Sequence, residues 1–333
     1  MQSFQPSPEK EPLPYQYGQL DPRKGPDDEP NKELLGKNTL GIEVTIPRLS
    51  ERCGLGNIDP QHTEGLQISA VQYVLQKYES GDFKLPPEGS VLVTIRPDAD
   101  AIGTMALITL LLEGEKITRE IKERIALINK IDSFVSGKWP GKQPLPSKEN
   151  PWPSSSFASG EERKEFSIVT AISMDNTLPL SERIRLVMEW LKTDKAPKEY
   201  QDMVNRERQE MISALENGEI KIEVREVNGI PVALVESTYL GGTTLAYTQA
   251  PVIIVKNPKH VFPGIEGTYL KYTVAQYNPG WVDLNKVKEE LNKLENGWGG
   301  SQTIIGSPQG ISSTLEMGQI FEIVAKNIIA QKG

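Results

Sequence analysis

Residues 91–107 read Val-Leu-Val-Thr-Ile-Arg-Pro-Asp-Ala-Asp-Ala-Ile-Gly-Thr-Met-Ala-Leu, and this stretch decides the fold. Its first five residues are apolar or β-branched without polar alternation, which predicts a strand buried on both faces. Because proline cannot donate to a sheet ladder, Pro97 ends the strand. Residues 101–112 are apolar almost all round, as in a helix that is covered on every side. The order indicates an α/β protein, with a parallel sheet and helices on both faces.

Two aspartates lie in the turn between this strand and this helix. Asp98 and Asp100 follow the carboxyl end of the strand, where open α/β sheets bind their ligands. Carboxylates two residues apart on an extended segment point the same way, so both could reach one hard cation such as Mn²⁺ or Mg²⁺. Arg96, just before them, could hold a phosphate group through two hydrogen bonds. In the alternative interpretation, Asp100 caps the helix and Asp98 faces water.

The strand, the Pro-Asp-Ala-Asp-Ala-Ile-Gly sequence at 97–103 and the apolar helix resemble the first motif of the DHH phosphoesterase superfamily. The resemblance implies hydrolysis of phosphoester or phosphoanhydride bonds with manganese or magnesium. Two departures concern the metal ligands. The Asp-His-His triplet of the family occurs nowhere in the chain, and Thr94 stands where the family has a histidine.

Length and composition restrict the class of protein. A chain of 333 residues is long enough for two domains, each with its own core. The net charge of −8 argues against duplex nucleic acid as a partner, because phosphate binding needs a basic surface. The single cysteine, Cys53, rules out an internal disulfide. The chain has no signal-peptide pattern and no apolar run of spanning length, so we expect a cytoplasmic protein without a membrane partner.

The sequence predicts three parts. Residues 1–38 are rich in Pro, Lys, Glu and Asp and lack apolar periodicity, which indicates a flexible tail. Residues 39–218 form the α/β domain, with further strands predicted at 40–46 and 167–172 and helices at 65–79, 117–132, 180–192 and 198–217. Residues 219–333 form a smaller mixed α/β domain, with a hairpin at Asn228-Gly229, strands at 251–256 and 269–277, a helix capped by Asp283 and a last amphipathic helix.

Three further side chains are candidate metal ligands. Asp132 ends a predicted helix beside a turn, so it could join the site or be an exposed helix-end residue. Asp175 follows the strand predicted at 167–172 and could be a later acidic ligand or a turn aspartate. His62 is one of only two histidines and follows Asp59 in a loop of turn-forming residues. Imidazole and carboxylate together suit a transition metal, although a lone histidine is more often a surface residue.

A glycine-rich segment, residues 296–310, is the second candidate for ligand binding. Glycines let backbone amides approach a ligand, and consecutive N–H groups in such turns bind anions. The alternative is a tight loop that needs glycine for positive φ. In its place after an amphipathic helix, the segment is similar to the loop of the DHH-associated domain, which implies contacts with the phosphate or nucleotide part of a substrate. The candidate residues are Gly299, Gly300, Ser301, Thr303, Gly306 and Ser307.

Two hypotheses for function follow. In the first, the protein hydrolyses a nucleotide, short oligonucleotide or polyphosphate in a cleft between its domains, with residues 143–160 as a lid, Asp98, Asp100 and Arg96 as catalytic residues and Mn²⁺ or Mg²⁺ as cofactor. In the second, a protein of the same fold has lost catalysis and binds a nucleotide or phosphate. In both, the partner is a small phosphorylated ligand or a short single-stranded oligonucleotide. The long helices could also support a homodimer.

Overall fold

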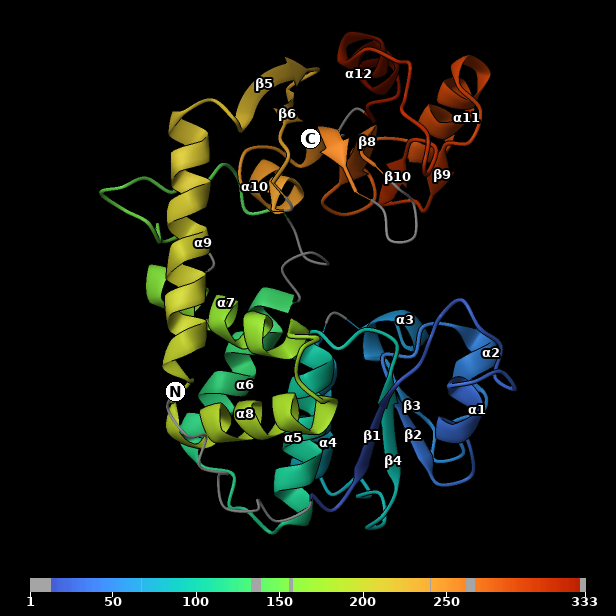
Figure 1. The fold of residues 1–333 in the computed structure, drawn as a ribbon, viewed down its shortest axis with the longest axis vertical. Helices are drawn as coiled ribbons and strands as arrows, with labels where there is room; N and C mark the ends of the chain where they lie inside the picture. Colours follow the sequence, from blue (N-terminus) through green and yellow to red (C-terminus); the bar gives the residue numbers. More distant parts are fainter. Residues whose placement is uncertain are drawn as a thin grey trace, which may run out of the picture. The chain divides into compact units, whose positions relative to one another are not determined.

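The computed structural model describes residues 13–66, 68–132, 139–155, 158–239, 241–261 and 267–329 (Figure 1). The chain forms two compact units, and each takes two separate segments of it. The first unit is Met1–Ser133 with Lys164–Val204, and the second is Phe134–Arg163 with Asn205–Gly333. The division therefore differs from the single boundary at residue 219 that composition suggested. Among the described residues, no helix is both long and apolar enough to cross a membrane.

A four-stranded parallel sheet forms the centre of the first unit, in the order β1-β4-β2-β3. The strands are β1 (Gln16–Gln19), β4 (Val91–Thr94), β2 (Thr39–Ile42) and β3 (Asn57–Ile58). The strand predicted at 91–95 is confirmed as β4, and it pairs with a neighbour on each side, which explains its continuous apolar sequence. The parallel-sheet α/β fold predicted for this unit is confirmed.

Helices cover both faces of this sheet (Figure 1). The buried helix is α5 (Ala99–Leu112), in contact with α4 (Ala70–Glu79), α6 (Arg119–Asp132) and α8 (Leu180–Thr193). On the other face, Val93 packs with Leu49 and Leu34. Those two leucines come from the short helices α2 (Pro47–Ser50) and α1 (Asn31–Leu34). Helix α3 (Pro60–Thr63) also belongs to this unit, and α7 (Gly160–Met174) and α9 (Lys198–Glu216) each have residues in both units.

Three predictions of local structure for the first unit are wrong. The described residues of the predicted tail are ordered into the fold, because β1 pairs with β4 and Tyr15 and Leu20 are buried. The strand predicted at 40–46 ends at Ile42, since Glu43 turns the backbone to a φ of 52°. The strand predicted at 167–172 is part of helix α7. Its β-branched residues face a helical core, where Val169 and Ile172 are buried.

The second unit is built on a mixed six-stranded sheet, in the order β5-β6-β7-β8-β10-β9. Only β6 and β7 are parallel. The strands are β5 (Lys221–Val227), β6 (Ile230–Glu236), β7 (Val252–His260), β8 (Tyr269–Gln276), β9 (Gly299–Gly300) and β10 (Ile304–Gly306). The predicted hairpin is confirmed, with Asn228 and Gly229 at φ values of 52° and 78° as a type I′ turn requires.

Two clusters of apolar residues fill the two faces of this sheet. On one face, β6, β7 and β8 pack against α11 (Leu284–Leu294) and α12 (Met317–Lys326). On the other face, Ala233, Ile253 and Ala275 meet Leu245 of α10 (Gly242–Tyr247) and Ala214 of α9. The predicted cap of α11 is confirmed, because the Asp283 side chain accepts a hydrogen bond from the Lys286 amide.

Candidate functional site

Carboxylates gather at the carboxyl edge of the parallel sheet. Glu43 follows β2, Asp59 follows β3, and Asp98 and Asp100 follow β4. Parallel neighbours end at the same edge of a sheet, which is where ligands bind in this class of fold. Asp132, the last residue of α6, adds a fifth carboxylate. We call these five residues the carboxylate cluster.

All four other members of the cluster act electrostatically on Glu43. Burial and the charges of the other four members, Asp100 first and then Asp98, Asp132 and Asp59, raise the pKa of Glu43 to about 10. Sequence reasoning missed Glu43, because it lies inside the segment interpreted as a strand. Its backbone has positive φ, an uncommon conformation for a residue other than glycine and one that concentrates at functional sites. The sequence offered one signal: Glu43 follows an apolar run, at the edge of the predicted sheet where ligands are expected to bind.

Asp98 and Asp100 accept hydrogen bonds from the first backbone amides of two different helices. Asp98 is the N-cap of α5, and its Oδ1 accepts a hydrogen bond from the Ala101 amide at 3.1 Å. Asp100 lies within the first turn of α5 and is buried, so the two aspartates do not share an extended segment as expected. Its two oxygens accept hydrogen bonds from the Ala70 amide at 2.6 Å and the Val71 amide at 2.9 Å, at the start of α4.

The alternative that Asp100 caps the following helix while Asp98 faces water is also wrong. Asp98 performs that cap, and Asp100 holds α4 instead. Burial, and after it the charge of Asp132, raise the pKa of Asp100 despite the two backbone hydrogen bonds that favour its ionised form. Arg96 is exposed at the rim, with its Nε 3.8 Å from Asp98 Oδ2.

Residues next to Asp59 in the sequence connect its segment to the carboxylate cluster by hydrogen bonds. The Gln61 amide group of α3 donates a hydrogen bond to Asp132 Oδ2 at 2.8 Å, and the Thr63 hydroxyl donates to the Asp59 carbonyl oxygen. Asp59 is buried. His62 belongs to α3, but its side chain lies outside what the structure describes.

The structure does not bring Asp175 to the carboxylate cluster. It follows the end of α7 and accepts hydrogen bonds from the Thr177 amide and hydroxyl and from the Tyr200 hydroxyl. These bonds lower its pKa, and its charge is not among those that act on Glu43 or Asp100. Asp175 therefore has a local structural role in the turn between α7 and α8.

The donor atoms of the cluster are all carboxylate oxygens, the ligands that Mg²⁺ and Mn²⁺ prefer. A divalent cation would also offset the mutual repulsion that raises the pKa of Glu43 and Asp100. In chemical type the residues therefore fit such a metal. Within the part of the chain that the structure describes, no three His, Cys, Asp or Glu side chains already have the mutual spacing of a metal site.

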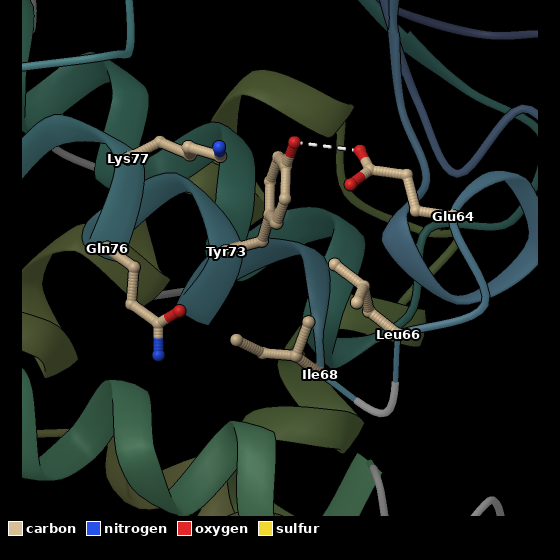
Figure 2. A pocket seen from close by; sticks show the side chains of 6 residues that line it. All are labelled: Glu64, Leu66, Ile68, Tyr73, Gln76 and Lys77. Carbon is tan, nitrogen blue, oxygen red and sulfur yellow. Dashed lines mark hydrogen bonds between the residues drawn. The ribbon is translucent and has the colours of Figure 1, made fainter. Parts of the chain in front are cut away.

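A surface pocket lies beside α4 in the first unit (Figure 2). Its volume is about 420 Å³, within the range of small-ligand sites. Figure 2 shows the Tyr73 hydroxyl donating to Glu64 Oε1, at 2.7 Å, and Lys77 Nζ lies 5.5 Å from the centroid of the same ring. The lining is completed by Leu66, Ile68 and Gln76. Helix α4 begins at Ala70, whose amide donates to Asp100, and it presents Tyr73, Gln76 and Lys77 to the pocket.

The glycine-rich segment of the second unit forms the hairpin β9–β10. Gly300 has a φ of 135°, and a Cβ there would collide with the Ile304 carbonyl oxygen. The Ser301 and Thr303 hydroxyls hydrogen-bond each other at 3.1 Å at the tip of the hairpin. Ser307 is buried, and its Oγ accepts a hydrogen bond from the Tyr272 amide. Close pairing of backbones therefore requires glycine at position 300, and Ser307 supports the sheet.

Comparison with known proteins adds no identification, since no protein-family model and no curated protein sequence matches this chain.

Proposed function

We propose that the first unit is a metal-dependent phosphohydrolase of the DHH type. The substrate would be a nucleotide, a short oligonucleotide or a polyphosphate. The observation that supports this function best is the meeting of five carboxylates from the ends of three adjacent parallel strands and one helix, with the pKa of two of them raised. Such clusters of perturbed groups at a ligand edge are typical of functional sites.

Each residue has a defined role in this proposal. Asp98, Asp132 and Glu43 supply oxygens toward a cation, and Asp100 fixes α4 from its buried position. Arg96, exposed beside Asp98, binds a phosphate oxygen of the substrate. A bound Mn²⁺ or Mg²⁺ would supply a water of lowered pKa and neutralise charge on the phosphoryl oxygens.

A second candidate function is binding of a nucleotide or phosphate without hydrolysis. Both aspartates of the motif already bind backbone amides, and Thr94 offers a hydroxyl where the related motif has an imidazole. The Thr94 hydroxyl is itself used in the turn, since it donates to the Arg96 carbonyl oxygen at 3.2 Å. A site with fewer ligands binds a metal more weakly, which favours this second function.

Calorimetric titration of Mn²⁺ into chelator-treated protein tests the proposal, together with a hydrolysis screen on nucleotides, short oligonucleotides and polyphosphate. Asp98→Asn removes one carboxyl ligand but keeps an N-cap side chain, and Glu43→Gln removes a second carboxyl ligand. We expect each to weaken Mn²⁺ binding and to lower turnover, each by about tenfold or more. Asp175→Asn and the exposed Asp202→Asn are the controls and should change neither.

The outcomes separate the two functions. Metal-dependent turnover that falls in Asp98→Asn and Glu43→Gln supports the hydrolase. Absence of Mn²⁺ binding in the unmodified protein contradicts it, and nucleotide binding without turnover would then support the second function.

A further inference from the structure

The pocket beside α4 shares a short segment of chain with the carboxylate cluster. That segment starts at Asp59, a member of the cluster, and ends at Ala70, whose amide donates to Asp100 at 2.6 Å. Three of the six lining residues lie within this segment, and the other three follow it on α4. Helices α3 and α4 are in contact with each other. The pocket and the cluster are therefore parts of one unit, joined by a few residues.

The charges of the described lining residues cancel. Glu64 contributes a carboxylate, and its Oε1 accepts a hydrogen bond from the Tyr73 hydroxyl at 2.7 Å. Lys77 contributes an ammonium group, which lies over the ring of the same tyrosine. Without a positive excess, the lining attracts a polyphosphate chain only weakly, because such a chain carries many negative charges. The pocket is therefore better suited to a neutral part of a ligand.

The other three lining residues match a planar ring with a polar edge. Leu66 and Ile68 supply aliphatic surface, and Leu66 is 42% exposed. Gln76 is exposed, and its side chain makes no hydrogen bond to another described residue. Figure 2 shows Ile68 and Gln76 extending toward each other on one side of the Tyr73 ring. A glutamine amide offers donors and an acceptor next to each other, as the edge of a nucleobase requires.

We propose that this pocket binds a nucleobase, and that adenine fits it best. One face of the ring packs on Leu66 and Ile68, while the Gln76 amide accepts from the amino group of adenine and donates to the adjacent ring nitrogen. In a nucleotide or a short oligonucleotide, the phosphate groups then extend toward the carboxylate cluster, a role that rests on the function proposed for the first unit. Polyphosphate, which has no base, is disfavoured as the substrate.

Titration of adenosine into the full-length protein, in a chelator-containing buffer, tests the pocket by itself. Adenosine carries no phosphate, and the chelator removes metal from the carboxylate cluster. Gln76→Leu keeps the approximate size of the side chain but removes its hydrogen-bonding groups, and it should weaken adenosine binding by about tenfold. Gln72→Leu makes the same change on the same helix outside the lining, so it should leave the affinity within about twofold.

Inosine separates recognition of the edge from packing of the ring. It presents an oxygen where adenosine presents an amino group, so the Gln76 amide loses one of its two hydrogen bonds. We expect the unmodified protein to bind inosine more weakly than adenosine, and Gln76→Leu to bind the two with similar affinity. Circular dichroism establishes that each variant is folded. Equal affinities for the two nucleosides in the unmodified protein would contradict the contact with Gln76.

The outcomes keep this proposal distinct from the hydrolase. Absence of adenosine binding would overturn the pocket, as would an equal loss in Gln72→Leu, even if metal-dependent turnover is found. Adenosine binding without metal-dependent turnover would support the pocket and count against the hydrolase alone. If both proposals hold, Gln76→Leu should raise KM for an adenine nucleotide several-fold while kcat changes little, because the base is bound equally in the ground state and the transition state.

Discussion

The Asp100 carboxylate accepts a hydrogen bond of 2.6 Å from the Ala70 amide, thirty residues earlier in the chain. A second oxygen of the same group accepts from the Val71 amide at 2.9 Å. The first turn of α4 is therefore fixed to the first turn of α5 by a buried carboxyl group. Backbone amides at a helix start have no intrahelical partner, so this side chain satisfies two of them.

Replacement of Asp100 by alanine should destabilise the protein, because two buried amides lose their acceptor. We expect the free energy of unfolding of the first unit to fall by about 2 kcal/mol, measured by urea denaturation. Asp98→Asn is the matched variant and should stay within about 0.5 kcal/mol, since asparagine also caps helices. Equal effects of the two changes would contradict the role given to Asp100.

Stability of the metal-free protein should decrease as pH rises from about 5 to about 8. The folded-state pKa of Glu43 lies at about 10, far above its ordinary value of 4.5, and that of Asp100 is also raised. Between the unfolded and folded pKa values the folded state binds more protons than the unfolded state, so raising the pH favours unfolding. Thermal unfolding in chelator across this range measures the slope. Glu43→Gln should make it shallower, and an unchanged slope would show that Glu43 does not titrate as described.

Addition of Mn²⁺ should raise the melting temperature more at pH 8 than at pH 5. Protons and the cation compete for the same carboxylates, so metal affinity rises as the carboxylates ionise. A ligand that binds only the folded state stabilises it by mass action. Melting curves with and without metal at the two pH values provide the measurement. A pH-independent metal effect would place the binding outside the carboxylate cluster.

Gly300→Ala should destabilise the second unit by about 1–3 kcal/mol. Its φ of 135° is unfavourable for alanine, and the added Cβ would meet the backbone of the paired strand. Gly299→Ala is the control, because open space surrounds the corresponding Cβ. Thermal unfolding of both variants would test the assignment, and similar melting temperatures for the two would contradict it.

Local signals predicted much of the fold. The buried strand β4, the apolar helix α5 and the Asn228-Gly229 hairpin each follow from a few adjacent residues. Strand β1 carries no such signal: it is a four-residue segment, Gln-Tyr-Gly-Gln, and it exists through pairing with β4 more than seventy positions away. The pattern of residues within β1 gives no information about that long-range pairing.

The sequence contains a start signal for helix α7, although the β-branched residues of the segment favour a strand. The Ser159 amide donates to Glu162 Oε2 at 2.7 Å, and the Glu162 amide donates to Ser159 Oγ at 3.2 Å. This reciprocal pair is a capping box, readable as Ser-x-x-Glu in the sequence.

In the carboxylate cluster, Asp98, Asp100 and Asp132 were predicted, whereas Glu43 depends on where a strand stops. The end of that strand is set by a backbone conformation and not by a residue pattern.

The two-segment composition of the second unit constrains the order of folding during synthesis. The Trp139 indole donates to the Tyr247 carbonyl oxygen, 108 positions later, and the Gln249 side chain donates to the Gln143 carbonyl oxygen. On the ribosome, residues 139–155 therefore emerge well before the strands that they pack against. Contacts of such separation form late and slowly. All residues of the first unit have been synthesised once residue 204 has emerged. Residues 139–155 can form their contacts only after residues of the last third of the chain have also emerged.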